Sequence, residues 1–194
     1  ETILEKISKA CLKFQIPLSL DETYATIVDE AIKLVKGDDG FIVRETDMNL
    51  ETVYGSSEDS ATYKVRNNGN SRKSLTENKA IIMHHDEIKI TDKVNYLKGI
   101  RSVIFIPLSY KENTEGVLVI RSLKEKYFTK QETDILLLFG SFASLAIKKN
   151  ELYDQTKQAL EVRDMFISLA SHELRTPLTS INGYIQLLYS KMGS

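Results

Sequence analysis

A long helical pattern in the last third of the chain constrains the fold more than any other feature of the sequence. Between residues 135 and 159, apolar side chains recur three, four or seven positions apart, which places one apolar stripe along an α-helix and is typical of a coiled coil. Thr129 and Glu132 form a predicted capping box at the start of this helix. Lys149 and Thr156 interrupt the stripe, whose apolar members are Ile135, Leu138, Phe142, Leu145, Leu152 and Ala159.

A second apolar stripe follows and runs toward the end of the chain. Its members are Phe166, Ala170, Leu174, Leu178, Ile181, Ile185 and Leu188. It is out of phase with the first stripe by one residue, and such a change of phase locally unwinds a supercoil. A single amphipathic helix of this length has nothing else to cover its stripe. We therefore predict a homodimer.

The residues before this helix predict a mixed domain of helices and strands. Helices are expected at residues 3–14 and 21–36, with Asp21 as the cap of the second and Gly37 as its left-handed stop. Residues 56–79 are polar and predict loops and short helices.

Four strands are expected, at residues 41–45, 50–54, 102–108 and 116–120. The last two are joined by a short polar loop and predict a hairpin. Neither of them alternates polar and apolar residues, so both faces of the sheet should be covered. An antiparallel sheet between layers of helices is an α+β fold, and this one continues into the long C-terminal helix.

Composition excludes several classes of protein. The chain has 194 residues, with 26 Lys and Arg against 27 Asp and Glu, so it lacks the basic excess of a nucleic-acid-binding protein. The single cysteine, Cys11, excludes an intramolecular disulfide and indicates a reducing compartment such as the cytoplasm. The longest apolar stretch, residues 135–147, is too short to span a bilayer. We expect any membrane attachment to come from segments outside this chain, since a first residue other than Met suggests a piece of a longer protein.

One short string carries a specific chemical signal. It reads Ser-His-Glu-Leu-Arg-Thr-Pro-Leu over residues 171–178. Helical geometry puts His172 and Thr176 on one face, away from the apolar stripe. A neutral imidazole there is an accessible nucleophile, and the adjacent carboxylate of Glu173 can accept its other ring proton. For an isolated histidine, a solvated side chain without a role is the simpler interpretation.

Residues 166–181 resemble the H-box of sensor histidine kinases, which lies in the first helix of the dimerisation and histidine-phosphotransfer (HisKA) domain. The resemblance implies that His172 accepts the γ-phosphoryl group of ATP and passes it to an aspartate in the receiver domain of a response regulator. Glu173 would be the supporting acid/base. Thr176 would position the water of a phosphatase reaction. Mg²⁺ would accompany ATP or the regulator.

The ATP-binding half of a histidine protein kinase is not recognisable in the sequence. No asparagine box or P-loop string occurs, and the one Asp-x-Gly, at residues 38–40, lacks the second glycine of a nucleotide lid. Phosphoryl transfer needs the phosphates and the metal to be held in place. We therefore expect residues 151–194 to supply a linker helix and part of the HisKA domain, and the chain alone to be inactive.

Residues 1–150 resemble a GAF sensor domain. The resemblance rests on residues 31–43, 99–108, 116–120 and 128–132. It implies an antiparallel sheet of about six strands, with helices on one face and a small-molecule pocket on the other. Cyclic-nucleotide-binding members carry Asn-Lys where this chain has Arg121 and Ser122, so the ligand is unknown and a cyclic nucleotide is disfavoured. Cys11 lies far from the pocket elements in sequence, which disfavours an attached bilin.

Two alternatives complete the sequence interpretation. His84 and His85 with Asp86 suggest a metal site, but neighbouring side chains on a strand point to opposite faces, so we predict no metal site. The competing function is a non-enzymatic GAF module for ligand binding or dimerisation, with the C-terminal helix as a connector.

Overall fold

The computed structural model describes residues 2–16, 18–47, 49–111 and 113–192, without the side chains of residues 93, 94, 176, 177, 180–182 and 184–192. The chain divides into two units, Glu1–Glu151 and Leu152–Ser194. The first unit has an α+β fold built on one sheet, and the described residues of the second, 152–192, are helical. No helix among the described residues has the length and apolar character needed to cross a membrane.

The sheet of the first unit is antiparallel throughout and has the order β2-β1-β5-β4-β3. The described part of the chain contributes five strands to it, where the resemblance implied about six. All four strands expected from the sequence are present. The bounds are Asp39–Thr46 for β1, Asn49–Gly55 for β2, Ile81–His84 for β3, Ser102–Tyr110 for β4 and Asn113–Ser122 for β5.

The hairpin of β4 and β5 is longer than the sequence predicted. Pairing continues past a register shift at Leu108 and Ser109 as far as Tyr110 opposite Asn113. Lys111 follows with a positive φ of 58°. The prediction of a loop from residue 109 was therefore wrong. The polar side chains there belong to the solvent-exposed end of a strand pair, which polarity alone does not distinguish from a loop.

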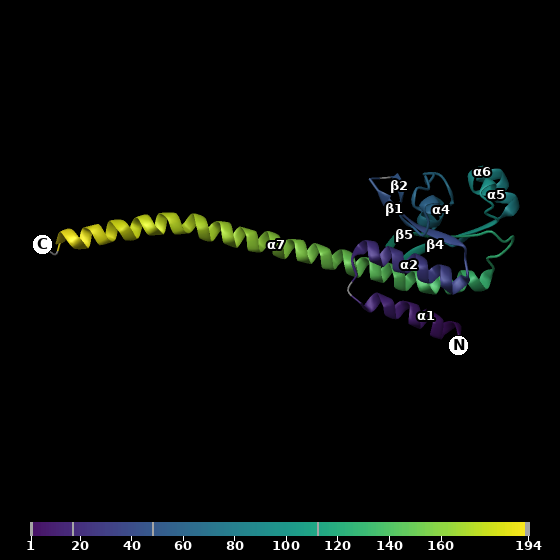
Figure 1. Cartoon of the computed structure of the whole chain (residues 1–194), viewed down its shortest axis with the longest axis horizontal. Helices are drawn as coiled ribbons and strands as arrows, with labels where there is room; N and C mark the ends of the chain where they lie inside the picture. The colour runs from purple at the N-terminus through teal and green to yellow at the C-terminus, as the bar shows by residue number, and fades with distance from the viewer. Residues whose placement is uncertain (1, 17, 48, 112, 193–194) are drawn as a thin grey trace. The chain divides into compact units, whose positions relative to one another are not determined.

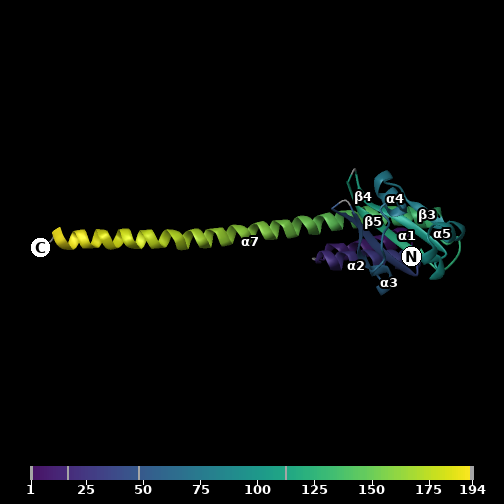
Figure 2. The same cartoon turned by 90° about the horizontal axis from the view of Figure 1, so that it is seen from above.

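Helices cover both faces of the sheet (Figures 1 and 2). One face packs on α2 and on the beginning of α7, through Ile42, Ile104 and Leu118 among others. The opposite face, which carries Phe41 and Val119, is covered by α4, α5 and α6. The helices are α1 (Ile3–Leu12), η1 (Lys13–Gln15), α2 (Leu20–Val35), α3 (Glu58–Ala61), α4 (Asn70–Glu77), α5 (His85–Thr91), α6 (Lys93–Leu97) and α7 (Lys130–Met192).

Capping residues set where the two longest helices begin. Ser19, not Asp21, caps α2, because its hydroxyl accepts from the backbone N–H of Glu22 while that residue's carboxylate accepts from the Ser19 N–H. At α7 the predicted pair is confirmed. The Thr129 N–H donates to the Glu132 carboxylate at 2.9 Å, and the Thr129 hydroxyl accepts from the N–H of Gln131.

Two hydrogen bonds hold α7 at the point where the first unit ends, at Lys149 and Asn150. The ammonium of Lys149 donates to the carbonyl oxygen of Phe14 at 3.2 Å, which ties α7 to η1. The next residue, Asn150, is buried and donates from Nδ2 to the hydroxyl of Thr23 on α2 at 2.5 Å. These hydrogen bonds anchor α7 in addition to its apolar contacts with the core.

Candidate functional site

His172 lies on α7 in the second unit and is open to solvent. The side chains of His172 and Glu173 are both 76% exposed, and 3.8 Å separates Nδ1 of the histidine from Oε1 of the glutamate. That distance is too long for a hydrogen bond. Both side chains are free to rotate at this exposure, so the carboxylate can reach Nδ1. Nε2 then remains accessible to a reaction partner.

The helix surface around His172 is apolar on its other side. Leu174 and Leu178 are both more than half exposed, as is Phe166 six residues before the histidine. Helical geometry places Leu174 about 200° around the axis from His172, so the apolar stripe and the histidine lie on different faces. The side chains of Thr176, Ile181, Ile185 and Leu188, which the sequence singled out, lie outside the described residues.

A second candidate site is a cavity of about 320 Å³ in the first unit, on the sheet face covered by α4, α5 and α6. Its floor is apolar and comes from the sheet, with Phe41, Val103, Phe105 and Val119. Its walls are mainly polar. They are formed by Tyr63, Arg66, Asn68, Asn70, Ser71, Thr91, Asp92 and Asn95, together with Val65, Gly69 and Met83.

Hydrogen bonds organise the polar wall of the cavity. The Tyr63 hydroxyl donates to Oδ2 of Asp92 at 2.7 Å, and Nδ2 of Asn95 donates to the same oxygen at 2.9 Å. Burial raises the pKa of the Tyr63 hydroxyl, and the hydrogen bond to Asp92 raises it further. Tyr63 therefore keeps its proton, which it donates to Asp92, and its hydroxyl oxygen can accept hydrogen bonds.

A buried arginine holds one of the residues that line the cavity, Asn95, by a hydrogen bond. The side chain of Arg121, on β5, is 2% exposed, and its guanidinium pairs with the carboxylates of Asp39 and Asp59 and donates to Oδ1 of Asn95 at 3.0 Å. Its guanidinium carbon lies 5.4 Å from the ring centroid of Phe41. Burial would raise the pKa of the Asp39 carboxyl, but hydrogen bonds from Ser56 and Arg121 outweigh it, and the pKa lies below its usual range.

Sequence reasoning missed this cluster. It interpreted Arg121 only as a departure from the Asn-Lys pattern, and residues 38–40 only as an incomplete nucleotide-lid motif. A usable signal was present, because Arg121 follows directly on the apolar residues 117–120 of a buried strand. An arginine in that position requires acidic partners.

The paired histidines do not converge on one site. His84 ends β3, and its Nδ1 lies 3.5 Å from the Ser102 hydroxyl. His85 begins α5 and its Nδ1 lies 3.5 Å from the carboxylate of Glu125. Within the described residues, no group of three histidine, cysteine or acidic side chains is arranged to hold a metal ion.

The comparison with protein families decides the assignment of the first unit. Residues 17–148 match the GAF domain family. The chain belongs to the GAF domain family. Residues 162–193, which include His172, match the His Kinase A (phospho-acceptor) domain. The sequence interpretation of a GAF domain followed by a HisKA segment is therefore confirmed.

Among curated proteins, the GAF–HisKA chain is similar to hybrid signal transduction histidine kinase G of Dictyostelium discoideum. The two are 32% identical over 105 residues, which is 46% of this chain and 3% of that protein. The chain thus spans only a small fraction of this relative.

Solved structures confirm the fold. The GAF domain of a phosphoenolpyruvate-protein phosphotransferase from Acinetobacter superposes with a TM-score of 0.64 at 14% identity, covering 77% of this chain and 94% of that one. The GAF domain of a two-component sensor histidine kinase from Bacillus halodurans gives 0.57 at 18% identity, with coverages of 71% and 99%. At these identities the likeness shows the fold alone.

Proposed function

We propose that this chain is the sensory and phosphoacceptor part of a two-component sensor histidine kinase. The observation that carries the proposal is an exposed histidine with an adjacent carboxylate, His172 and Glu173, inside the segment that matches the phospho-acceptor domain. The GAF domain in front of it contains a cavity of the size that takes small molecules. In this proposal the GAF domain controls phosphorylation of the histidine.

The phosphoryl step follows from the two side chains. Nε2 of His172 attacks the γ-phosphorus of ATP, a nitrogen–phosphorus bond forms, and the bond to the leaving ADP oxygen breaks. Glu173 faces Nδ1 at 3.8 Å and stabilises the positive charge that develops on the ring. ATP and Mg²⁺ would be held by a catalytic domain outside this chain, so the chain alone should not turn over.

The phosphoryl group would then pass from His172 to an aspartate in the receiver domain of a response regulator. The exposure of His172 supports this step, because a protein partner has to reach Nε2. The apolar residues Leu174 and Leu178 on the other side of the helix support a homodimer. The spacing of Glu173 and Thr176 supports an additional phosphatase activity toward the regulator.

Phosphorylation by a separately produced histidine kinase catalytic domain tests the proposal. The whole chain is incubated with that domain, Mg²⁺ and γ-labelled ATP, and acid-labile label on the chain is counted. Label is expected on the wild type and on His85→Gln, and none on His172→Gln. Equal labelling of all three would overturn the assignment of His172. Absence of label from the wild type would favour a non-enzymatic GAF module with a connector helix.

The GAF cavity supports a small-molecule signal with an apolar part and several hydrogen-bonding groups. The apolar floor would contact the apolar part of the ligand. The hydroxyl of Tyr63 and the side-chain amides of the wall would form hydrogen bonds with its polar groups. Native mass spectrometry of the purified chain tests this. We expect an added mass on the wild type that is lost in Val119→Phe, whose larger side chain fills the floor. An added mass retained by Val119→Phe would place the ligand elsewhere.

A further inference from the structure

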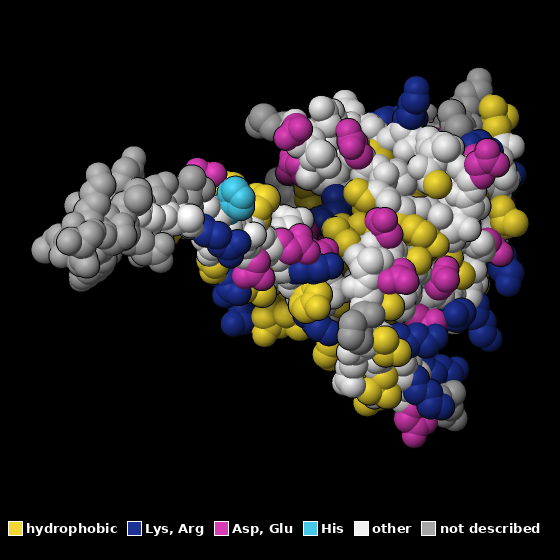
Figure 3. Space-filling model, turned by 60° about the vertical axis from the view of Figure 1, so that its left-hand side comes forward, with side chains coloured by type: hydrophobic (Ala, Val, Ile, Leu, Met, Phe, Trp, Pro, Cys, Tyr) yellow, Lys and Arg dark blue, Asp and Glu magenta, His cyan; other side chains and the backbone are white. Residues whose placement is uncertain are grey.

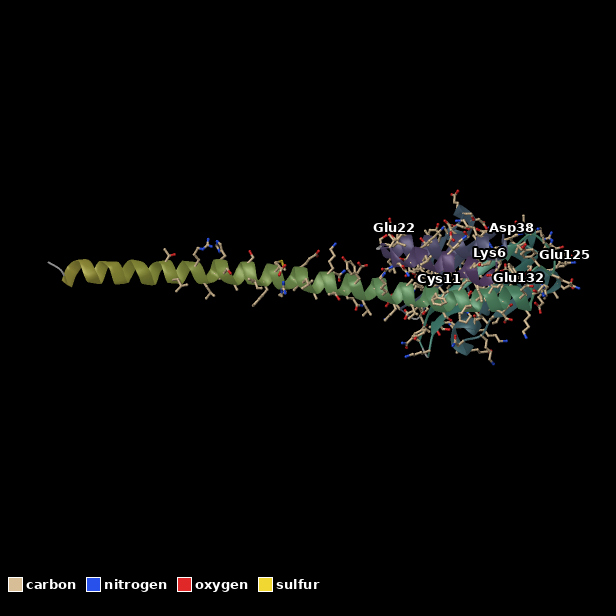
Figure 4. All side chains as sticks on the ribbon, turned by 90° about the horizontal axis from the view of Figure 1, so that it is seen from below. Lys6, Cys11, Glu22, Asp38, Glu125 and Glu132 are labelled. Carbon is tan, nitrogen blue, oxygen red and sulfur yellow. The ribbon has the colours of Figure 1, made fainter. Side chains whose placement is uncertain are left out.

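The first turn of α4 forms part of the wall of the GAF cavity (Figure 1). Gly69 precedes the helix and lines the cavity, and of the described residues of α4 itself only Asn70 and Ser71 do so. Figure 4 views the GAF domain from the opposite side, where α2 with Glu22 and α7 with Glu132 cover the other face of the sheet. Helix α4 therefore meets the cavity with its N-terminal end.

The backbone N–H groups of this first turn are left without a side-chain acceptor. Gly69 is the N-cap, and none of the described side chains caps the helix there. The N–H of Lys73 donates to the carbonyl oxygen of Gly69, so the N–H groups of Asn70 and Ser71 lie before the first helical hydrogen bond. Together with the positive end of the helix dipole, such N–H groups attract an anion.

The side chain of Ser71 lacks a partner as well. Ser71 is 5% exposed and lines the cavity, and its hydroxyl forms no hydrogen bond with the part of the chain that the structure describes. Buried hydroxyl groups are nearly always hydrogen-bonded, because burying one alone costs free energy. Ser74, one turn later, is also buried and donates to the carbonyl oxygen of Lys79 at 2.8 Å. The Ser71 hydroxyl thus points to an acceptor supplied by a ligand.

The charges in the cavity wall favour a negative acceptor. Arg66 contributes a cation, whose guanidinium donates to the carbonyl oxygen of Thr91 and keeps further N–H donors. Asp92 is the one carboxylate that the described residues contribute to the lining, and its oxygens already accept from Tyr63 and Asn95. On the side of the molecule shown in Figure 3, acidic and basic side chains are interspersed, so selection of a charged ligand depends on groups inside the cavity.

We propose that the beginning of α4 is an anion-binding site within the GAF cavity, and that the ligand carries a carboxylate or phosphate group beside an apolar part. The anionic group would accept from the N–H and the hydroxyl of Ser71, and the apolar part would contact Phe41 and Val119 on the floor. Gly69 suits this position because, without a side chain, it leaves the first turn open to the ligand. The inference rests on the function proposed for the cavity and adds the chemical class of its ligand.

Binding of small aromatic probes to the whole chain tests the class of ligand. Phenylacetate and phenyl phosphate carry a ring and an anionic group, benzyl alcohol carries the ring without the charge, and inorganic phosphate carries the charge without the ring. Isothermal titration calorimetry should give a dissociation constant roughly tenfold lower for one anionic aromatic probe than for benzyl alcohol or inorganic phosphate. The tighter of the two identifies the ligand group as carboxylate or phosphate. If neither binds more tightly than benzyl alcohol, the proposal is overturned.

Ser71→Ala tests where the anionic group binds. The substitution removes a hydroxyl that has no partner among the described residues, so the fold should not suffer. Affinity for the tighter anionic probe should fall by about threefold or more, while affinity for benzyl alcohol stays the same. Ser74→Ala is the matched control and should bind as the wild type does, because the Ser74 hydroxyl is bonded within the chain. Wild-type affinity in Ser71→Ala would contradict the proposal.

Gly69→Asp supplies the missing carboxylate from the chain itself. The backbone of Gly69 is extended, with φ −88° and ψ −173°, so an aspartate can take its place as N-cap and accept from the N–H groups of the first turn. The variant should stay folded by circular dichroism and bind the anionic probe about tenfold more weakly or worse. Unchanged affinity in the folded variant would show that the anion binds elsewhere and would refute the site.

Val119→Phe separates this inference from the proposed function. Its larger side chain fills the floor of the cavity and should weaken binding of every aromatic probe. If it does so while Ser71→Ala and Gly69→Asp bind as the wild type does, the cavity remains a ligand site and only the anion site is refuted. If Val119→Phe binds all probes as tightly as the wild type, they bind outside the cavity, and the anion site is refuted as well. Neither result bears on label at His172.

Discussion

Arg44 on β1 and Glu151 on α7 form an ion pair, with 2.7 Å between Nη1 of the arginine and Oε1 of the glutamate. Their side chains are 21% and 19% exposed. The same guanidinium donates to the hydroxyl of Tyr24 on α2 and to the carbonyl oxygen of Glu115 on β5, both at 2.7 Å. Arg44 thus connects three elements of the GAF domain to the residue at which α7 leaves it.

Replacing Arg44 by alanine should destabilise the first unit. The mostly buried carboxylate of Glu115 would lose its arginine partner, and that of Glu151 would keep only the more distant Lys148. Losing one partner of such a network costs roughly 2–4 kcal/mol. Urea unfolding followed by circular dichroism measures the change. Lys148→Ala is the control, because Lys148 reaches Glu151 from the solvent side at 3.5 Å and is 49% exposed. That variant should lose less than about 1 kcal/mol, and an equal loss in both would contradict the prediction.

The carboxyl of Asp39 should make the stability of the GAF domain depend on acidic pH. Burial raises its pKa, but hydrogen bonds from Ser56 and Arg121 lower it more, so its pKa in the folded protein is depressed. Such a group stabilises the fold above its ordinary pKa of about 3.9, and the contribution is lost as the pH falls from there through the folded pKa.

Urea unfolding between about pH 5 and pH 2.5 tests this dependence. The free energy of unfolding of Asp39→Asn should fall less steeply with decreasing pH than that of the wild type, and the two curves should converge at the acidic end. Asp29→Asn, which removes an exposed carboxyl on α2, should follow the wild-type slope. Parallel curves for wild type and Asp39→Asn would show that the pairing of Asp39 with Arg121 contributes nothing.

The amino-acid pattern predicted the layers of the fold better than it predicted the polar contacts within the fold. The alternation of Ile42 and Leu118 with Phe41 and Val119 between the two sheet faces follows from apolar strands covered on both sides. The His172 string was recognisable because its residues are contiguous. Arg121 and Asp39 are 82 positions apart in the sequence, and Arg44 and Glu151 are 107 positions apart. Only the folded chain brings these partners together.

Glu173→Gln should slow phosphorylation of His172 without abolishing it. An amide cannot take the Nδ1 proton or stabilise the charged ring, and general acid–base assistance is worth about 10²-fold or more. The initial rate of labelling by the separate catalytic domain measures this. Glu161→Gln, an exposed glutamate on the same helix, controls for loss of charge and should label at the wild-type rate. A Glu173→Gln rate within twofold of wild type would assign the carboxylate no chemical role.

Thr176→Ala should separate the two reactions proposed for the phospho-acceptor helix. Its hydroxyl is expected to position the water that hydrolyses the phospho-aspartate of the response regulator, whereas phosphorylation of His172 does not need it. The variant should therefore accept label at the wild-type rate but remove at least tenfold less phosphate from a phosphorylated regulator. Thr179→Ala is the control, because the Thr179 hydroxyl already donates to the carbonyl oxygen of Arg175. Equal losses of both reactions in Thr176→Ala would indicate a general disturbance of the helix.

The change of phase between the two apolar stripes predicts how the GAF domain controls the histidine. One residue inserted between Ala159 and Phe166 rotates every later side chain by about 100° relative to the GAF domain, whereas seven inserted residues restore the original phase. If signal passes as a repacking of paired helices at this point, the single insertion should lock or invert the output of the full-length kinase. The seven-residue insertion should leave the output responsive. The ratio of phosphorylated regulator with and without stimulus measures both variants, and an unchanged ratio after the single insertion would rule out helix phase as the signal.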